Sequence, residues 1–386
     1  MIPGFALALL LSVPLPVPDD LSARIAQTPA DGTLELDADA TYRVTAPLIL
    51  NRPIRIVGHG ARIIVDDGAK IADAVIMSQG VDRIVLEDMT IDANVDRNGA
   101  DYGVWIRGGS QHHFSGLHVS NSSQACILLE DASGSVEGNT LDRCGRELTI
   151  RRGGAANNHA ILIAALSRPV SGISVVRNTV SNAYRKGITA YTRAPGSLSD
   201  VTIADNRVSG AGLGGIYVAN APGASTVYKV AIRGNIVRNS YVGYEVDNVT
   251  GLTLSANVAD NMRDLVGRPG AEGLVIHKVR NANIQSLSVH GSGSGGITVI
   301  DSRNVELIAP NIVDGNDGNN GYAPGIQVRG SSNVNVKDMS IVDTSARTRT
   351  HAGFTHGFVE IGPAGGNSSS VRRMDGIALP MLRMPR

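Results

Sequence analysis

Short apolar runs recur along the chain with a shared internal pattern. Most of the runs begin with Gly, after which aliphatic residues alternate with more varied ones. Gly, Asn and Ser are common in the segments between the runs. The runs are GVWIRG, CILLED, AILIAA, GITAYT, GIYVAN, GYEVDN, GLVIHK, GITVID, GIQVRG and GFVEIG. Because side chains of a strand point alternately to its two faces, residues two and four of each run share one face. The pattern predicts many short strands, each with one aliphatic face.

The residues on that face are almost all aliphatic. They are Val104/Ile106, Ile127/Leu129, Ile161/Ile163, Ile188/Ala190, Ile216/Val218, Tyr244/Val246, Leu274/Ile276, Ile297/Val299 and Ile326/Val328. Repeated units of this kind bury their apolar faces by stacking on one another. We therefore predict an all-β fold, a single-stranded right-handed parallel β-helix (solenoid) of about eleven coils over residues 19–362. At ~4.8 Å per strand the stack would be about 50 Å long.

An asparagine precedes a short second strand in many of the repeats. The asparagines are Asn139, Asn178, Asn206, Asn235, Asn257 and Asn311, at intervals of 39, 28, 29, 22 and 54 residues. Unequal intervals fit coils of constant core length that carry loops of variable length. Asparagine tolerates left-handed geometry at a tight corner, and its amide can bond the equivalent amide of the next coil. We predict a structural ladder at this corner rather than a ligand site.

The two ends of the chain differ from the repeats. Residues 1–18 hold an apolar run of signal-peptide length, too short for an ordinary membrane-spanning helix. We interpret them as a signal peptide, with a disordered start as the alternative, and expect a secreted or periplasmic protein without stable membrane insertion. Leu21 and Ile25 lie four residues apart, as in a helical turn that caps an apolar stack. Residues 363–386 are predicted to form a C-terminal tail.

Composition narrows the classes of partner. The formal net charge is zero and aromatic residues make up 4% of the chain, which disfavours nucleic-acid binding. An anionic partner would have to be held by a local basic patch. Cys126 and Cys144 are the only cysteines and show no zinc-site spacing. We expect two buried free thiols rather than a bridge between neighbouring coils. Nothing in the sequence indicates the oligomeric state.

The segment GTLELDADATYRV…PLILNRPIRIVGHG resembles the entry coil of the pectate-lyase-like superfamily, and the Gly-Ile-x-Val and Asn-x-Val runs are similar to its repeats. The resemblance covers about residues 31–362. It implies a carbohydrate-active protein, in a superfamily that includes lyases, hydrolases, epimerases and phage tailspikes. The paired Asp, Gly-His-Gly and Arg-Ile-Lys motifs of polygalacturonases are absent, and so is the Asp-Pro-His motif of mannuronan epimerases.

Residues three and five of each run are predicted to face outward and to align in two columns. The flanking coils carry mainly Leu, Ala, Thr and Ile there, whereas the middle coils carry Tyr191, Tyr217, Glu245, Asp247 and His277. Lys186 stands at one strand entrance and Lys278 at another strand exit. The resemblance implies a substrate groove in this region. A solvated polar surface is the alternative interpretation.

Loops before these strands add positive charge. Arg151 and Arg152 precede His159, and Arg185 precedes Lys186. Because arginine binds carboxylates with two parallel hydrogen bonds, the clustering predicts an acidic ligand, with merely solvated loops as the alternative.

These residues suit proton transfer beside the carboxylate of a uronate sugar. That chemistry needs a base, a group that neutralises the developing enolate, and an acid for the leaving oxygen. We favour an enzyme, a polysaccharide lyase or an epimerase acting on an acidic polysaccharide or oligosaccharide. Asp247 beside His277 would favour the imidazolium form, which suits an acid or a neutraliser. The predicted catalytic residues are Tyr191, His277 and Lys186; the predicted substrate-binding residues are Arg151, Arg152, His159, Arg185, Tyr217 and Lys278.

Glu245 and Asp247 leave several alternatives open. They could bind Ca²⁺, which prefers hard oxygen ligands and would bridge to the substrate carboxylate. Side chains at i and i+2 of a strand lie ~7 Å apart, within the ~6.5–9.5 Å of an inverting glycoside hydrolase, and Tyr217 or Trp105 would then stack on a sugar. A third alternative is a non-catalytic glycan-binding or tailspike-like protein.

Overall fold

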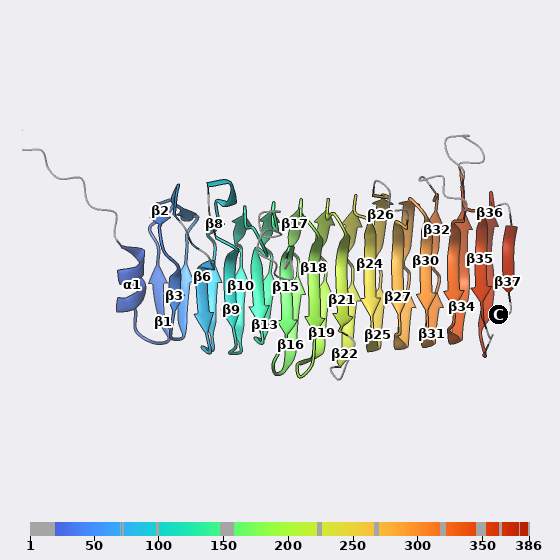
Figure 1. The fold of residues 1–386 in the computed structure, drawn as a ribbon, viewed down its shortest axis with the longest axis horizontal. Helices are drawn as coiled ribbons and strands as arrows, with labels where there is room; N and C mark the ends of the chain where they lie inside the picture. The colour runs from blue at the N-terminus through green and yellow to red at the C-terminus, as the bar shows by residue number, and fades with distance from the viewer. Residues whose placement is uncertain are drawn as a thin grey trace, which may run out of the picture.

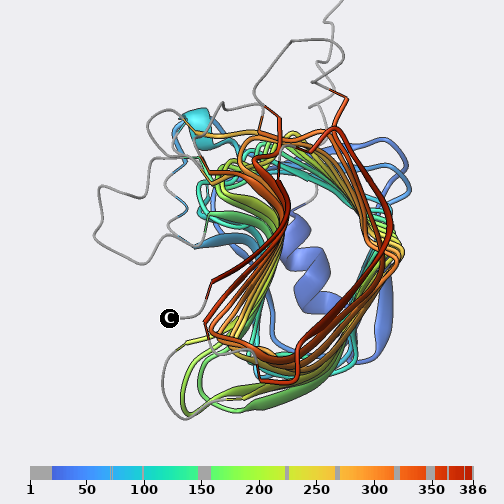
Figure 2. The same ribbon diagram turned by 90° about the vertical axis from the view of Figure 1, so that its right-hand side faces the viewer.

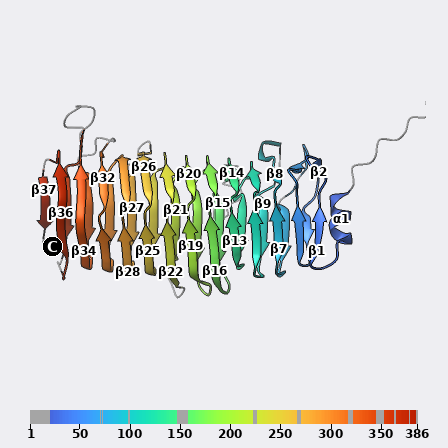
Figure 3. The ribbon, with the colours of Figure 1, turned by 180° about the vertical axis from the view of Figure 1, so that it is seen from behind.

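The computed structural model describes residues 20–69, 71, 73–97, 100–146, 158–221, 226–265, 270–316, 322–344, 353–362, 365–377 and 379–384. Apart from helix α1 (Leu21–Gln27) and one turn of 3₁₀ helix (Val95–Arg97), its regular elements are strands. Every pairing between strands is parallel, and the strands stack along one long axis (Figures 1 and 3). The described part of the chain is therefore a parallel β-helix, as the sequence predicts.

One sheet has 13 strands and contains all ten of the apolar runs. Three further strands, β3, β6 and β37, lack the leading glycine, so the stack is longer than the eleven coils predicted. The strands are β3 (Leu48–Leu50), β6 (Ala74–Gln79), β9 (Tyr102–Arg107), β12 (Ile127–Glu130), β15 (His159–Ala165), β18 (Lys186–Thr192), β21 (Gly214–Asn220), β24 (Val242–Asp247), β27 (Glu272–His277), β30 (Gly295–Ile300), β33 (Pro324–Arg329), β35 (His356–Ile361) and β37 (Leu379–Met384).

The other sheet has 24 strands, because most coils contribute two consecutive strands to it. The first of each pair are β1 (Gly32–Glu35), β4 (Ile54–Val57), β7 (Ile84–Glu87), β10 (His112–Ser115), β13 (Gly134–Glu137), β16 (Pro169–Val176), β19 (Ser197–Ala204), β22 (Val227–Arg233), β25 (Val249–Ser255), β28 (Arg280–Gln285), β31 (Arg303–Ile308), β34 (Ser332–Val342) and β36 (Ser368–Asp375). The second are β2 (Thr41–Val44), β5 (Arg62–Val65), β8 (Thr90–Asp92), β11 (His118–Ser120), β14 (Thr140–Asp142), β17 (Thr179–Ser181), β20 (Arg207–Ser209), β23 (Ile236–Arg238), β26 (Val258–Met262), β29 (Ser288–Ser292) and β32 (Asn311–Val313). Strand β34 pairs with both β31 and β32, so the two runs merge there.

The buried apolar side chains form one main core, enclosed by the stacked coils that Figure 2 shows end-on. The predicted inward residues are all buried, including Ile188, Ile216 and Tyr244, which are aligned by register. The leading glycines are needed for close packing. A Cβ at Gly215 would lie 2.2 Å from Cγ1 of Val237, closer than real contacts allow.

The predicted asparagine ladder is present at one corner. Asn178 Nδ2 donates to Asn206 Oδ1 at 3.0 Å, Asn206 Nδ2 donates to Asn235 Oδ1 at 2.9 Å, and the chain of bonds continues from Asn139 to Asn257. All five side chains are buried, so the amides satisfy one another and the backbone. Asn311 is a correction: it lies one position later, in β32, and Leu287 and Pro310 replace asparagine at the corner.

The two ends of the stack are built differently. Leu21 and Ile25 of α1 are buried in the main core, and α1 lies at the end of the stack, beside the first coil (Figure 1). At the other end, β36 pairs with β34 and β37 pairs with β35. The sheets thus continue past residue 362, where we predicted the tail to begin.

The two cysteines form a disulfide, which corrects the expectation of free thiols. Cys126 and Cys144 are both fully buried, and their Cα atoms lie 5.4 Å apart. That separation is within the range a disulfide spans. The bond links the start of β12 to the segment just after β14, within one turn of the coil.

Candidate functional site

The outward columns align as predicted, but they are not uniformly exposed. Strand register places Tyr191 beside Ala219, Ala219 beside Asp247, and Asp247 beside His277. In the earlier coils, Leu128 and Leu162 are buried instead of facing solvent. They form a small apolar cluster outside the sheet, together with Ala74, Tyr102, Ala125, Ala164, Met77, Trp105 and Leu166. This cluster borders the polar region.

A pocket of about 460 Å³ opens where the apolar cluster ends. It contains five of the predicted site residues. Its lining comprises Leu128, Glu130, His159, Leu162, Ala164, Leu166, Arg185, Lys186, Thr189, Tyr191, Arg193 and Tyr217. We call it the Lys186 pocket. Three cationic side chains and two tyrosines thus share one cavity on the outward face of the 13-stranded sheet.

Lys186 is held by two neighbours from later coils. Its Nζ donates to Oε2 of Glu245 at 2.6 Å and lies 3.1 Å from the ring centroid of Tyr217. Burial lowers the pKa of Lys186, against the opposing effect of the Glu245 carboxylate. Burial also raises the pKa of the Tyr217 hydroxyl, and the charges of Glu245 and Asp247 add to that rise. At neutral pH these conditions keep Tyr217 a neutral phenol.

His159 forms part of the same pocket in its neutral form. Its Nδ1 lies 3.0 Å from Oγ1 of Thr189. Burial lowers the pKa of His159 to about 3, with further contributions from the charges of Lys186 and Arg185. A neutral imidazole can accept or donate a hydrogen bond without adding charge to the site.

Asp247 and His277 form a second polar group beside the pocket. His277 Nδ1 lies 3.0 Å from Oδ1 of Asp247, and its Nε2 lies 3.6 Å from Oδ2 of Asp301. Sequence reasoning missed Asp301, because it follows the fifth position of its run and lies outside the two columns considered. The ring thus has a carboxylate oxygen near each of its two nitrogens.

The remaining predicted residues are placed as follows. Arg151 and Arg152 lie outside the described residues. Lys278 is exposed in the turn after β27 and does not line the Lys186 pocket. Glu245 and Asp247 face cationic or histidine partners, and no group of three or more His, Cys, Asp or Glu side chains in the described ranges could hold a metal ion. Calcium binding at this pair stays a prediction.

A third outward row was overlooked in the sequence. The residue just before each apolar run aligns from coil to coil, and we call this the entry row: His159, Lys186, Gly214, Val242, Glu272, Gly295, Pro324 and His356. Lys186 was noted as an isolated strand entrance rather than as a row member. Strict alternation hides this row, because the position before a run has the same parity as residues two and four, which point inward. In the structure the leading glycines also face the core, so the alternation is broken there.

Glu272 is the acidic member of the entry row. It lines a pocket of about 250 Å³ together with Gly270, Ser294, Gly295, Tyr322, Pro324 and Gln327. Burial raises the pKa of Glu272 to about 7. We call this the Glu272 pocket.

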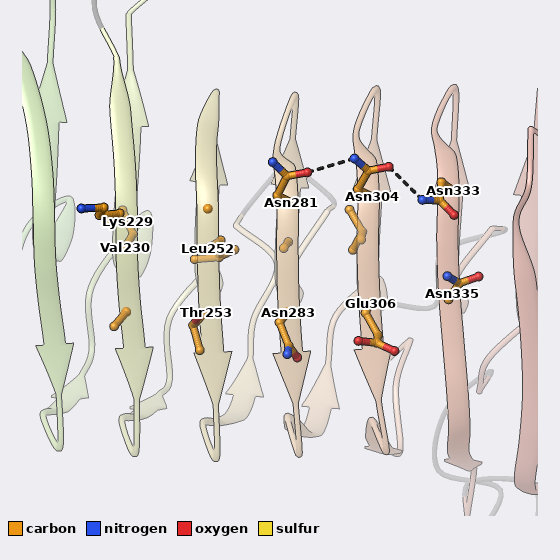
Figure 4. Close-up of a pocket in the computed structure, with 14 residues that line it drawn as sticks. Lys229, Val230, Leu252, Thr253, Asn281, Asn283, Asn304, Glu306, Asn333 and Asn335 are labelled. Carbon is orange, nitrogen blue, oxygen red and sulfur yellow. Dashed lines mark hydrogen bonds between the residues drawn. The ribbon is translucent and has the colours of Figure 1, made fainter.

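A further hollow, of about 670 Å³, lies on the 24-stranded sheet (Figure 4). Exposed amides line it: Asn304 Nδ2 donates to Asn281 Oδ1 at 2.9 Å, and Asn333 Nδ2 donates to Asn304 Oδ1 at 2.8 Å. Its charged residues, Lys229 and Glu306, form ion pairs with side chains outside the hollow. This surface offers hydrogen bonds but no group placed for proton transfer.

The sequence matches the family described as "Right handed beta helix region" over residues 49–198 and 194–355. Because the match spans well over half of the chain, the protein belongs to the right-handed beta helix family. This also confirms the predicted handedness. No curated protein matches the chain in sequence. In the described part of the chain, no helix has the length and apolar character needed to cross a bilayer.

Three solved structures illustrate the similarity in fold. Bacteriophage CBA120 tailspike protein 3 has 12% identity and a TM-score of 0.55, covering 94% of this chain and 56% of its own. The catalytic unit of a GH87 α-1,3-glucanase from Streptomyces thermodiastaticus has 13% identity and a TM-score of 0.53, covering 92% and 65%. The A-module of the Azotobacter vinelandii mannuronan C-5 epimerase AlgE6 has 15% identity and a TM-score of 0.50, covering 95% and 91%. At such identities the similarity shows the fold alone.

Proposed function

We propose that the protein acts on an acidic, uronate-containing polysaccharide by removing the proton beside the sugar carboxylate, as a lyase or an epimerase. The observation that carries the proposal is the lining of the Lys186 pocket. Arg185, Lys186 and Arg193 surround one cavity that also contains Tyr191 and the neutral His159. Cationic side chains around a confined site favour a carboxylate ligand.

Each role in the reaction has a candidate in this pocket or beside it. A base takes the C5 proton of the uronate, and the electron pair passes into the carboxylate as an enolate. In elimination, the pair then forms the C4–C5 double bond while the C4–oxygen bond breaks and an acid protonates the leaving oxygen. In epimerisation, a proton returns to C5 from the opposite face and no bond of the chain breaks.

Lys186 and Tyr191 are the residues to which we assign the proton transfers in the pocket. The lowered pKa of Lys186 increases the fraction that is neutral and able to act as a base. Tyr191 lies on the same strand and lines the same pocket. His277, one strand beyond Asp247, is placed to neutralise charge or donate a proton. Arg185, His159 and Tyr217 would position the sugar.

We assign Glu245 the role of holding Lys186, with calcium binding at Glu245 and Asp247 as the alternative. Its carboxylate already accepts a short hydrogen bond from the ammonium group. Calcium binding at Glu245 and Asp247 would need both carboxylates to exchange their partners. An Asp247→Asn variant whose activity recovers when Ca²⁺ is added would favour the metal alternative.

The disulfide supports an oxidising location for the protein. Disulfides persist in secreted and periplasmic proteins and are rare in the cytosol of most organisms. The buried Cys126–Cys144 bond therefore fits the same compartment as a polysaccharide substrate.

A non-catalytic glycan-binding role is the second candidate. The hollow in Figure 4 favours it, since side-chain amides such as Asn304 and Asn335 can bond neutral sugar hydroxyls. Binding of a neutral glycan, lost in Asn304→Ala and accompanied by no turnover, would support this candidate.

Incubation with a panel of uronate polymers tests the proposal. Absorbance of the unsaturated uronate and the number of reducing ends should rise together for a lyase. An epimerase changes neither, and proton NMR of the polymer then shows the altered sugar. Reducing ends without unsaturated product would indicate a hydrolase using Glu245 and Asp247, and would overturn the proposal.

A further inference from the structure

The Glu272 pocket lies on the same outward face as the Lys186 pocket. Glu272 and Lys186 occupy the entry row, on β27 and β18, three strands apart in the sheet. At ~4.8 Å per strand their backbones are separated by ~14 Å. An oligosaccharide of a few residues spans that distance, so one polysaccharide chain can contact both pockets.

Glu272 has unsatisfied hydrogen-bonding capacity. Its side chain is bonded to Thr298, but Oε2 is buried and has no hydrogen-bond partner. Buried polar atoms are nearly always paired, and an unpaired one destabilises the fold. The neighbouring entry-row residue is Gly295, where any side chain would narrow the space beside the Glu272 carboxyl group. One oxygen of the Glu272 carboxyl group therefore makes no hydrogen bond within the fold and is open to a ligand in the pocket.

The charged groups near Glu272 are few. Asp264 accepts hydrogen bonds from the backbone of Gly270, and Arg329 exerts a weaker electrostatic effect on the carboxyl group. No Lys or Arg is among the described residues that line the pocket. This lining does not suit a sugar carboxylate, but it suits hydroxyl groups, which can donate to a carboxylate.

Tyr322 contributes an aromatic ring to the lining of the Glu272 pocket. Tyr322 is 43% exposed, and its hydroxyl accepts from Nε2 of Gln327 at 3.2 Å. The ring also contacts His356, with centroids 5.7 Å apart. A supported, exposed aromatic face can pack against the C–H face of a pyranose.

We propose that the Glu272 pocket is a second saccharide subsite, which binds one pyranose residue through its hydroxyl groups and packs its ring against Tyr322. Glu272 and Gln327 accept or donate the hydrogen bonds. The subsite rests on the proposed function in one respect, namely that the bound chain also reaches the Lys186 pocket. In this proposal Glu272 and Tyr322 determine the length of oligosaccharide that the protein binds tightly, and they take no part in the reaction.

Binding of oligomannuronates and oligogalacturonates of graded length tests this subsite. Calorimetry is done on full-length protein with Tyr191→Phe, which lacks the proposed proton-transfer hydroxyl, so the oligomers stay intact. Added Tyr322→Ala or Glu272→Ala should weaken binding of long oligomers about tenfold, or about 1.4 kcal/mol. Binding of disaccharides should not change. Tyr228→Ala, an equally exposed tyrosine on the other sheet, is the matched control.

The outcomes separate the subsite from the proposed reaction. Equal affinity of long oligomers for all variants, or no binding of any oligosaccharide, overturns the subsite. Binding of long neutral glucan oligomers alone, weakened by Tyr322→Ala, supports the subsite and removes the uronate substrate. Melting curves for each variant establish that the protein is folded, and Tyr322→Phe, which keeps the ring, should retain most of the affinity.

Discussion

The Lys186 pocket and the Glu272 pocket belong to one row of one sheet, yet they suit different parts of a substrate. Burial acts on both: it lowers the pKa values of Lys186 and His159 and raises that of Glu272. Cations and tyrosines line the first pocket, whereas a carboxyl group and an aromatic ring line the second. The comparison shows that a repeated backbone can present a reactive site and a holding site a few strands apart, through substitutions at one position of the repeat.

The largest expected effect concerns stability against pH, where the two pockets should behave in opposite ways. Glu272 has a raised folded pKa, so its contribution to stability is present below about pH 4.5 and is lost as the pH rises to about 7. His159 has a lowered folded pKa, so stability is lost as the pH falls from 6.5 towards 3. Each effect is on the order of 3 to 5 kcal/mol in full.

Urea unfolding of the wild type, Glu272→Gln and His159→Gln between pH 4 and 8.5, in steps of ~0.5, measures how the free energy of unfolding changes with pH. Glu272→Gln should gain stability relative to the wild type as the pH rises from 5 to 7 (about 3 kcal/mol at most). His159→Gln should gain it as the pH falls. Parallel curves for wild type and both variants would show that neither group is buried as described.

The next effect is on turnover and should separate the pockets by role. Lys186→Met removes the ammonium group but keeps an unbranched chain over Tyr217, and we expect turnover to fall about 10²-fold or more with little change in KM. Lys337→Met, which removes a lysine from an exposed ion pair with Glu306, is the control and should leave turnover unchanged. Full activity in Lys186→Met would move the reaction away from this pocket.

The sequence predicts the fold much better than the site. The alternation in the apolar runs identifies Ile188 and Ile216 as inward residues, and the same spacing identifies the ladder of Asn178, Asn206 and Asn235, because both patterns repeat with the coil. A site depends on which outward residues meet across coils, and loops of unequal length hide that register. Tyr191 and Tyr217 are predicted because they lie at regular offsets within the runs.

Other features could not be inferred from spacing alone. The burial of Leu128 and Leu162 depends on contacts outside the sheet, which strand periodicity does not encode. Pairing of Cys126 with Cys144 depends on a Cα separation that arises from one turn of the coil. Glu272 was missed because a single glutamate before a glycine has no distinguishing pattern until its neighbours, Gly295 and Tyr322, are placed around it.

The smallest expected effect is electrostatic. If the Lys186 pocket binds a uronate, Arg185→Gln combined with Arg193→Gln should weaken binding several-fold and flatten its dependence on salt, since exposed charge interactions are screened. Glu272→Gln should leave the salt dependence as it is. Arg207→Gln, on the other sheet, serves as the control. Unchanged salt dependence in the double variant would argue for a neutral sugar in the Lys186 pocket.

Proton abstraction at C5 of a uronate is the central claim, and exchange with solvent tests it most directly. Uronate polymers are incubated with the protein in D₂O, and C5 is followed by NMR, with Lys186→Met as the comparison. The account predicts deuterium at C5, or loss of the C5 proton in an unsaturated product, with the wild type and at least about 10²-fold less with Lys186→Met. Cleavage or tight binding of a uronate polymer with every C5 proton retained would contradict it.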